Sequence, residues 1–449
     1  MYKRLQKTRT TLPLITVLPL SFRLSRLFVF CLGGMICLAG CSRKESPAAP
    51  DGAALFSKKC MSCHQPGNDM RAPVPEILHQ MTKATIMAAL DTGRMKWEGR
   101  FLSKIQKTAI AEYLGAQDVS PSAGMTGACP RDLDPPANLP AWSGWGGDLG
   151  NTRFQPAFSA GLKRDQIKDL KLNWSYGFPG AAATFGQPTV FGGKLFVGSE
   201  DGTVQALDSA TGCVWWRFKA SATVKTAISI DNRGNTVFFG DTNGYVYALK
   251  ALDGSVVWKV HPDSHLAARI TGSPLLVEQR LYVPVSSGEE GAAADARYPC
   301  CTFRGSVVAL DIASGQQIWK AYTIPDDPKP IRKSSQGVQY WGPSGAAVWS
   351  APTADLKRHA IYVTTGNNYS SPSTVSSDAI LAFDMRSGKR LWSRQFTAKD
   401  LWNSGCVAQQ KDNCPDPRGG DFDFGAPPVL KSLADRDLLL LTQKSGMVF

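Results

Sequence analysis

The sequence predicts a small all-α domain followed by an all-β propeller, and three observations support this fold class. Apolar residues recur at helical spacing towards residue 114, and Gly115 ends the pattern. From about residue 141 short strand-like stretches replace the helical pattern, and a motif that ends in Trp occurs four times. Residues 118–140 are rich in Pro, Ser, Gly and Asp, which favours a linker between the two.

The N-terminus has the composition of an export signal. Six basic residues and no acidic one precede Cys41, and the apolar stretch Leu27–Leu38 is too short to span a bilayer comfortably. Leu38-Ala39-Gly40-Cys41 resembles the lipobox of bacterial lipoproteins. We therefore expect residues 1–40 to be a cleaved signal peptide, Cys41 to carry a lipid anchor to a membrane in the periplasm, and residues 41–50 to be a tether. An uncleaved anchor and an ordinary signal peptide are the alternatives.

The charge of the chain argues against one class of partner. The formal net charge is +13, and removing the six basic residues of the leader leaves +7. No basic run accompanies this surplus, so we do not expect nucleic-acid binding. The surplus is compatible with an acidic redox partner and equally with general solubility.

The predicted helical domain, residues 51–117, contains the motif Cys60-Met61-Ser62-Cys63-His64. At this spacing Cys60 and Cys63 bond the vinyl groups of a haem and His64 ligates its iron, so we expect a c-type cytochrome domain. A structural or metal-binding Cys-x-x-Cys pair is the alternative. A covalently held haem would supply apolar bulk that so small a domain lacks. The predicted apolar face of its last helix comprises Leu102, Ile105, Ala109, Ile110, Tyr113 and Leu114.

The second axial position of the iron requires a further nitrogen or sulfur donor downstream. Met95, in Thr92-Gly93-Arg94-Met95, lies where small c-type domains usually place their methionine. Met70, Met81 and Met87 compete for this role, although the spacing of the last two is more typical of a helix core. We expect Met95 to be the second haem ligand.

The repeat that predicts the propeller has the pattern Ala-x-Asp-x-x-Thr/Ser-Gly-x-x-x-Trp in three of its four copies, and the copy from Ala248 has Lys250 and Asp253 at the Asp and Thr/Ser positions. Its Gly is expected to turn the chain into the next strand and its Trp to pack between sheets. Strand-turn-strand patterns separate the copies, and Asp201-Gly202 is a tight-turn signal within one of them. Four strands per unit with a recurring Gly and Trp indicate a β-propeller, with a β-sandwich as the alternative. The copies are Ala206–Trp216, Ala248–Trp258, Ala309–Trp319 and Ala382–Trp392.

The chain has eleven cysteines. Those outside the leader, the lipid site and the haem motif form an even set, which fits an oxidising, exported setting. Cys406 and Cys414 are close enough in sequence to close one loop, whereas a bond between the neighbours Cys300 and Cys301 would form a strained ring. Reduced, buried thiols are the alternative. The set is Cys129, Cys213, Cys300, Cys301, Cys406 and Cys414.

The Trp repeat resembles the tryptophan-docking motif of quinoprotein dehydrogenases that use pyrroloquinoline quinone (PQQ), across roughly residues 141–449. A c-type haem domain before the propeller resembles the polyvinyl-alcohol dehydrogenases of this family, because most quinohaemoprotein alcohol dehydrogenases carry it after the propeller. The resemblance implies an eight-bladed propeller, of which about four to five blades are present here. The sequence stops in mid-pattern at Phe449, so we expect a C-terminally truncated chain or a fragment.

The resemblance also implies a PQQ site. Trp349 matches the tryptophan that lies flat beneath the quinone rings, with an ordinary inter-blade Trp as the alternative. Thr271 and Ser287 match residues that contact a quinone carboxylate, and Lys444 matches a basic residue that polarises a quinone carbonyl. Weaker candidates for the rim are Gln187 and Lys225.

A Ca²⁺ ion beneath the quinone is implied in the same way. The stretch Val283–Gly291 resembles the family's Ser-Ser-Gly-x-Glu strand end, which makes Glu290 a ligand, and a Thr-Gly-Asn turn makes Asn367 another. Oxygen donors of this kind are what Ca²⁺ requires. In the family a vicinal cysteine pair can rest on the quinone face. Here Cys300 and Cys301 follow the Ser-Ser-Gly stretch instead of preceding it, and they stay candidates for contact with the quinone face.

The general base of the family is an Asp in a stretch that resembles Asp-x-Trp-Asp-x-Asp. Here Asp400-Leu-Trp-Asn403 breaks off, an insertion from Cys406 to Cys414 follows, and Asp421-Phe-Asp423 resumes the pattern. We expect Asp421 to act as the base and to share in binding Ca²⁺, with Asp423 and Asp400 as rivals. Solvated loop acids are the alternative.

With haem c, PQQ and Ca²⁺ as cofactors, the resemblance implies oxidation of secondary alcohols to ketones in the periplasm. An Asp removes the hydroxyl proton, hydride passes to the quinone, and electrons leave singly through the haem to a soluble cytochrome c or similar acceptor. The implied substrate is polyvinyl alcohol. A dehydrogenase for small alcohols and a non-enzymatic propeller lipoprotein for outer-membrane assembly are the alternatives.

Overall fold

The computed structural model describes residues 50–449 apart from short gaps, and residues 49–449 group as one compact unit. The predicted signal peptide, the lipobox, Met70 and most of the predicted linker lie outside the described residues. In the part of the chain that is described, no helix has both the length and the apolar character needed to cross a bilayer. The gaps are residues 66–71, 80, 92, 94, 116–126, 131–140, 179–180, 182 and 409–410.

The N-terminal region is all-α, as predicted. Asp51 caps its first helix, since Asp51 Oδ1 accepts the amide of Ala53 at 2.9 Å, and Ser103 with Gln106 forms a reciprocal capping box on its last. The helices are α1 (Gly52–Lys59), α2 (Met61–His64), α3 (Pro75–Leu78), α4 (Lys83–Asp91), α5 (Lys96–Gly99) and α6 (Lys104–Leu114).

The helical core is small and lies between α1, α4 and α6. Phe56, Ile110 and Leu114 are almost fully buried within it. The predicted apolar face of α6 was wrong at two positions, because Ile105 and Tyr113 remain 67% and 40% exposed. A helix of this length packs only a narrow strip against two neighbours, so part of a broad apolar face stays in solvent.

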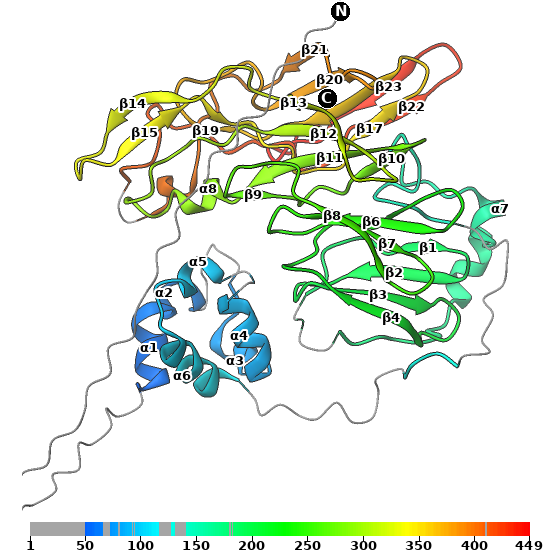
Figure 1. Ribbon diagram of the computed structural model, residues 1–449, viewed down its shortest axis with the longest axis horizontal. Coiled ribbons are helices and arrows are strands. Elements are labelled where there is room, and N and C mark those ends of the chain that lie inside the picture. The colour runs from blue at the N-terminus through cyan, green and yellow to red at the C-terminus, as the bar shows by residue number, and fades with distance from the viewer. Residues whose placement is uncertain are drawn as a thin grey trace, which may run out of the picture. The chain divides into compact units, whose positions relative to one another are not determined.

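The second region is a series of antiparallel sheets whose strands follow one another in chain order, which confirms the predicted propeller architecture. Figure 1 shows the first two sheets stacked face to face. The first comprises β1 (Thr189–Phe191), β2 (Lys194–Gly198), β3 (Thr203–Asp208) and β4 (Val214–Lys219). The second comprises β5 (Ser229–Ile230), β6 (Thr236–Gly240), β7 (Val246–Lys250) and β8 (Val256–Val260).

The third and fourth sheets carry most of the site described below. The third comprises β10 (Leu275–Val277), β11 (Arg280–Ser287), β12 (Ser306–Asp311) and β13 (Gln317–Tyr322), with β9 (Ala268–Arg269) paired to β11. The fourth comprises β17 (Thr353–Asp355), β18 (Ala360–Thr364), β20 (Ala379–Asp384) and β21 (Arg390–Gln395). Smaller elements are α7 (Ala157–Ala160), η1 (Arg164–Asp169), α8 (Glu289–Ala292), η2 (Ser404–Cys406), and the pairs β14 (Lys329–Lys333) with β15 (Gln339–Gly342), β16 (Ser344–Gly345) with β19 (Asn368–Ser370), and β22 (Val429–Ser432) with β23 (Asp437–Leu440).

The repeat explains how each sheet is fixed to the next. The indole N–H of Trp216 donates to the carbonyl of Ala251 in the second sheet's turn at 3.0 Å, and Trp258 and Trp319 make the equivalent bond one sheet further on. Gly254 in the same turn has a φ of +74°, and a Cβ there would lie 2.7 Å from the Trp216 ring. The Gly and Trp of the repeat are therefore one joint between neighbouring sheets.

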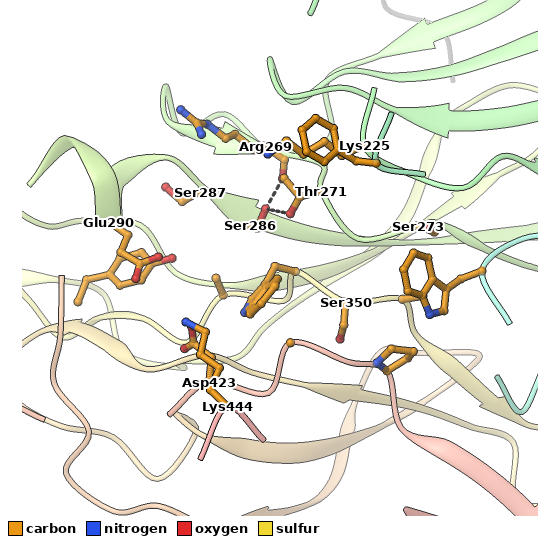
Figure 2. Close-up of a pocket in the computed structure, with 18 residues that line it drawn as sticks. Lys225, Arg269, Thr271, Ser273, Ser286, Ser287, Glu290, Ser350, Asp423 and Lys444 are labelled. Carbon is orange, nitrogen blue, oxygen red and sulfur yellow. Dashed lines mark hydrogen bonds and ion pairs between the residues drawn. The ribbon is translucent and has the colours of Figure 1, made fainter. Parts of the chain in front are cut away.

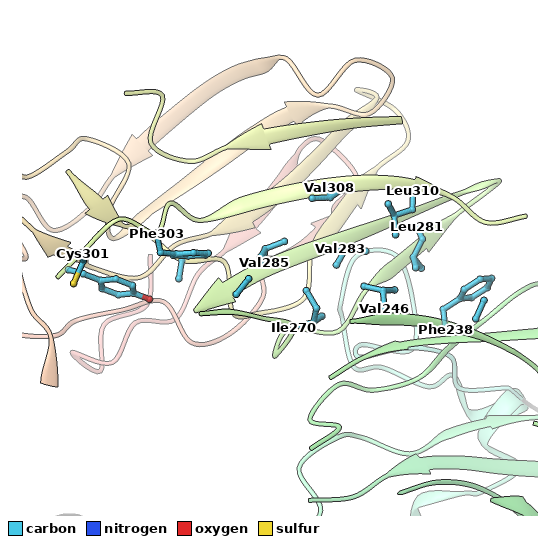
Figure 3. Close-up of a cluster of buried hydrophobic side chains, with 14 of the residues drawn as sticks. Phe238, Val246, Ile270, Leu281, Val283, Val285, Cys301, Phe303, Val308 and Leu310 are labelled. Carbon is cyan, nitrogen blue, oxygen red and sulfur yellow. The ribbon is translucent and has the colours of Figure 1, made fainter. Parts of the chain in front are cut away.

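Apolar layers fill the space between the sheets. Between the second and third sheets, Phe238 and Val246 face Ile270, Leu281 and Val283 (Figure 3), and none of the five is more than 1% exposed. Burial of side chains of this size contributes about 1.5–3 kcal/mol each to the free energy of unfolding. The loops that form the site are thus held by rigid, closely packed sheets.

The structure pairs all six cysteines of the predicted even set. Cys406–Cys414 closes the insertion, as its spacing suggested, and the neighbours Cys300 and Cys301 are also bonded. Cys129–Cys213 spans 84 residues and ties the predicted linker, within which Cys129 lies, to the residue before β4. The alternative of reduced thiols is therefore wrong in this structure.

Candidate functional site

A cavity of about 400 Å³ opens between segments that are far apart in sequence. The loop after β9 and the end of β11 form one wall, and the segment between β16 and β17 together with residues 423–427 forms another. Figure 2 shows Arg269, Ser287 and Glu290 towards one end of the cavity and Ser273 and Ser350 towards the other. Hydroxyl and charged side chains share the walls with aromatic rings and other apolar surface, so the cavity suits a ligand that has both apolar faces and polar groups.

The cavity gathers most of the residues predicted to contact a quinone. Thr271, Ser287, Trp349, Lys225 and Lys444 all line it. The Thr271 hydroxyl lies 2.7 Å from the hydroxyl of the neighbouring Ser286, which also lines the wall (Figure 2). Gly425 packs so closely on Trp349 that a Cβ would lie 2.5 Å from the indole, so glycine is required for this approach.

Three carboxylates meet at the cavity: Glu290 and Asp423 line its wall, and Asp421 lies beside them without being a lining residue. One oxygen from each of Glu290, Asp421 and Asp423 lies within 4.8 Å of the others. Burial, reinforced by the two aspartates, raises the pKa of Glu290 to about 8. Burial also raises the pKa of Asp421 to about 6, although Lys444 counteracts this. Such mutual repulsion is relieved when a cation binds between the carboxylates.

Lys444 balances part of this negative charge. Its Nζ lies 2.8 Å from Asp421 Oδ1 and 2.6 Å from Asp423 Oδ2. Burial lowers the pKa of the Lys444 ammonium, but the two carboxylates more than offset this and leave the pKa above its ordinary value. The same Nζ lies 5.6 Å from the centre of the Trp349 ring. A protonated Lys444 is therefore fixed between the acidic cluster and the aromatic wall.

Asn367 is hydrogen-bonded to the cluster through Asp423, although it is not among the residues that line the cavity. Its amide N–H donates to Asp423 Oδ1 at 2.6 Å, and its side-chain Nδ2 donates to the carbonyls of Trp402 and Asn368. These bonds leave Asn367 Oδ1 buried and without a hydrogen-bond partner among the described residues. A buried oxygen without a donor is costly, and a hard cation would satisfy it. The residues present thus fit the Ca²⁺ site that the resemblance implies.

Other predicted residues lie outside the cavity wall. Cys300 and Cys301 are buried in the apolar layer around Phe303, and Gln187 is not among the lining residues. Asp400 is 1% exposed, and its carboxylate accepts the amides of Asp421 and Phe422 at 3.0 and 2.6 Å. Asp400 thus holds the turn that carries Asp421, and its oxygens are already engaged.

The sequence interpretation missed several lining residues, and Arg269 and Tyr369 are the two of these with the most strongly perturbed ionisable groups. Arg269 Nη2 is buried and makes no hydrogen bond within the described residues, and burial lowers the pKa of this guanidinium. Tyr369 is fully buried, and its burial together with Glu290 raises the pKa of its phenol well above the ordinary value. The sequence offered one indication that Arg269 lines the cavity: it lies two residues before Thr271, which was a predicted quinone contact.

The haem motif has the geometry that ligation requires. Cys60 and Cys63 are free thiols and are not bonded to each other. His64 is 6% exposed, and its Nδ1 lies 2.7 Å from the carbonyl oxygen of Pro73. When Nδ1 donates this bond, Nε2 is left to ligate an iron. The residues present therefore fit a covalently held haem.

The second haem ligand is not decided by the packing. Met95 is partly buried against the helical core, but Met81 and Met87 pack against the same cluster. Met95 therefore stays a prediction.

Comparison with known proteins agrees with this geometry. The family model of the glucose/ethanol/alcohol dehydrogenase β-propeller domain that uses PQQ matches residues 142–410, and the model of the cbb3-type cytochrome c oxidase subunit III matches residues 47–114. A solved quinohaemoprotein alcohol dehydrogenase from Comamonas testosteroni covers 70% of this chain with a TM-score of 0.53 at 22% identity, and 47% of that structure is matched. This structural likeness supports the fold.

Two curated relatives are more similar in sequence. A polyvinylalcohol dehydrogenase from a Pseudomonas species is 37% identical over 89% of this chain, and one from a Sphingopyxis strain is 36% identical over 89%. The chain spans 65% and 64% of the length of these two relatives. Since the propeller model covers more than half of the residues, the chain belongs to the PQQ-dependent alcohol dehydrogenase family of β-propeller proteins, here preceded by a cytochrome region.

Proposed function

We propose that the protein oxidises secondary hydroxyl groups of polyvinyl alcohol to ketones, with PQQ, a divalent cation and haem c as cofactors. One observation carries this proposal: a single cavity is lined by Glu290, Asp423, the Trp349 ring and Lys444. Asp421 completes the acidic cluster beside it, and Asn367, whose Oδ1 has no hydrogen-bond partner among the described residues, is bonded to Asp423. When bound, the quinone supplies the hydride acceptor, the cation a Lewis acid and the haem a one-electron carrier. The two polyvinylalcohol dehydrogenase relatives support the choice of substrate.

The chain's own residues hold and orient the flat cofactor. Thr271, Ser286 and Ser287 present hydroxyl groups on one wall, and Arg269 beside them has a buried Nη2 that makes no hydrogen bond to any described residue. These donors suit the carboxylates of a tricarboxylic quinone. Trp349 offers an aromatic surface for the rings of the quinone. The polar side chains thus face the charged edge of the ligand, and the indole faces its flat apolar surface.

Asp421 is the proposed general base. Its side chain is 28% exposed, whereas that of Asp423 is 5% exposed, so Asp421 has a route for releasing the proton to water. Its raised pKa of about 6 lies close to neutral pH, which suits proton transfer. Asp423 is engaged with both Lys444 and the Asn367 amide, which suits a fixed ligand of the cation.

The charge of the cluster favours a divalent ion. Glu290, Asp421 and Asp423 carry three negative charges when ionised. Lys444 forms ion pairs with both aspartates, and its positive charge offsets one of the three. A cation of charge two balances the remainder, and the all-oxygen donor set suits a hard ion such as Ca²⁺. Titration calorimetry on protein stripped of metal should therefore detect calcium binding that Glu290→Gln weakens. Equal calcium affinity in this variant and the wild type would contradict this assignment.

The substrate is tested by comparing polymer with small alcohols. The loaded full-length protein is supplied with an electron-accepting dye and with polyvinyl alcohol, 2-propanol or ethanol in turn. We expect the polymer to give the highest kcat/KM, and chelation of the metal to abolish dye reduction. Turnover of 2-propanol or ethanol without turnover of the polymer would favour a small-alcohol dehydrogenase instead.

Export and anchoring are proposed from the leader sequence. Lipidation at Cys41 would hold the enzyme on the periplasmic side, where a bulky polymer is accessible and a soluble cytochrome c can collect electrons. Cys41→Ala should move the protein from the membrane fraction to the soluble periplasmic fraction. An unchanged membrane fraction would contradict the lipid anchor.

A further inference from the structure

The short helix α5 and the turn after it, residues 96–101, contact the propeller beside the cavity. Arg100 Nη2 lies 2.7 Å from Asp295 Oδ2. The guanidinium of Arg269 lies 5.8 Å from the centre of the Trp97 ring, and that of Arg297 lies 5.1 Å from the Phe101 ring. These residues follow directly after Met95, the expected haem ligand. We call residues 96–101 the docking turn.

Arg269 contacts both the quinone cavity and the docking turn. It lines the cavity, and its strand β9 pairs with the end of β11 through Ser286 and Ser287. The same guanidinium packs on the Trp97 ring of the docking turn. The side chain of Arg269 therefore lies between the quinone cavity and Trp97 and contacts both.

The propeller side of the contact is rigidly supported. Asn413 Nδ2 donates to the carbonyls of Ala293 and Asp295 at 3.0 and 2.7 Å. Arg297 donates from Nε and Nη2 to the two carboxylate oxygens of Asp295, each at 3.0 Å. Asn413 belongs to the insertion closed by Cys406–Cys414, whose role the quinone site leaves unexplained. The supported segment continues α8, which carries Glu290. The insertion thus links the docking surface to the cation ligand.

We propose that Trp97 is a positioning residue that fixes the haem against the quinone cavity, with Arg269 as the shared wall and the 406–414 insertion as its support. This inference rests on the proposed function. Each alcohol oxidised leaves two electrons and two protons on the quinone. The electrons pass one at a time to the haem iron, reducing Fe³⁺ to Fe²⁺, an external acceptor reoxidises the iron each time, and the protons leave to water. Trp97 is neither oxidised nor reduced, but sets the separation that the electrons cross.

The test uses the full-length, fully loaded protein in two variants, Trp97→Ala and Trp97→Phe. Haem reduction by alcohol is followed in a stopped-flow instrument, and reduction of a dye that collects electrons directly from the quinone is followed in parallel. Loss of the indole is expected to slow haem reduction several-fold in the Ala variant, because electron transfer slows with separation, with a smaller loss for Phe and unchanged dye reduction.

The matched control is Trp215→Ala. Trp97 and Trp215 each have a buried indole nitrogen without a hydrogen-bond partner among the described residues, and a lysine lies over each ring at 5.7 and 5.1 Å. Trp215 belongs neither to the docking turn nor to the residues that line the cavity. We expect haem reduction at the wild-type rate in this control. An equal loss in both variants would show a general packing effect and overturn the proposal.

A second measurement does not depend on turnover. Hydrogen exchange is recorded on quinone-free protein, and we expect Trp97→Ala and Asn413→Ala each to deprotect residues 96–101 and 289–297 together. Unchanged exchange in both segments, with haem reduction at the wild-type rate, would overturn the inference. If wild-type protein reduces neither dye nor haem with any alcohol, the proposed function fails, while the exchange experiment still tests the docking.

Discussion

The haem motif and the quinone cavity place their ligands in contrasting ways. Cys60, Cys63 and His64 lie within one short motif at the junction of α1 and α2, so local helix geometry brings them together. The cavity instead combines Thr271 from the third sheet, Trp349 from the segment before the fourth, and Lys444 from beyond β23. The first site therefore depends on local structure and a covalent bond, and the second depends on the packing of whole sheets.

Removing the haem attachment is the strongest way to separate the two sites. In the double variant Cys60→Ser with Cys63→Ser no haem is bound covalently, and we expect the helical region to lose its structure because its core is small. Calcium binding by the propeller should be unchanged. Pyridine haemochrome spectra, far-ultraviolet circular dichroism and calcium titration measure the three quantities. Loss of calcium binding in this variant would show that the sites are not independent.

Removing the proposed base separates chemistry from assembly within the cavity. Asp421→Asn is expected to lower kcat by about 10²–10⁴-fold, because the substrate hydroxyl loses its proton acceptor. PQQ binding and the haem spectrum should remain. Asp423→Asn is the paired variant, and its main loss should be in calcium affinity. If Asp421→Asn turns over at the wild-type rate while Asp423→Asn does not, the two roles are exchanged.

Matched core variants sharpen the comparison. Phe238 between the second and third sheets and Phe56 in the helical core are 1% and 2% exposed. Replacing either by Ala should cost about 3–5 kcal/mol in the free energy of unfolding of its own region. Phe238→Ala should also weaken PQQ binding, whereas Phe56→Ala should not. Denaturant titration with PQQ binding measured alongside tests this, and weakened PQQ binding in Phe56→Ala would contradict it.

A change of pH should alter calcium binding at the quinone cavity but not retention of the covalent haem. We expect this effect to be smaller than the effects of the variants above. In the metal-free protein burial raises the pKa of Glu290 to about 8 and that of Asp421 to about 6. Protons therefore compete with the cation, and calcium affinity should fall about tenfold per pH unit between about pH 8 and pH 6. The raised values also mean that metal-free protein binds more protons folded than unfolded, so its stability should fall as pH rises through this range.

The control for this pH effect is the covalent haem, whose retention should not change over the same range. Calcium titrations at pH 6, 7 and 8, with thermal melts of metal-free protein, give both quantities. A calcium affinity that is constant with pH would contradict the raised pKa of Glu290.

The difference between the sites also decides what the sequence could predict. The haem motif is readable because its residues are neighbours in sequence, and the repeated Gly and Trp are readable because one joint recurs between sheets. The resemblance located Thr271, Trp349 and Lys444 in one cavity, which spacing alone could not have done because sheet packing brings them together.

The sequence could not predict contacts that depend on how loops fold. The Cys300–Cys301 pair lies in the apolar layer because Glu289, fully buried, accepts the amides of Thr302 and Phe303 at 2.8 and 2.7 Å and draws the loop inward. Nothing in the local sequence shows this bond. The same holds for Asn413, whose support of the docking surface requires the insertion and α8 to be neighbours in space.

The central claim is that the quinone cavity and the haem share one electron path, and anaerobic mixing of the loaded protein with polyvinyl alcohol tests it most directly. The account predicts that the reduced haem α-band grows in protein loaded with PQQ and calcium, and not in protein lacking either. A haem that remains oxidised at full occupancy of both cofactors would contradict the account.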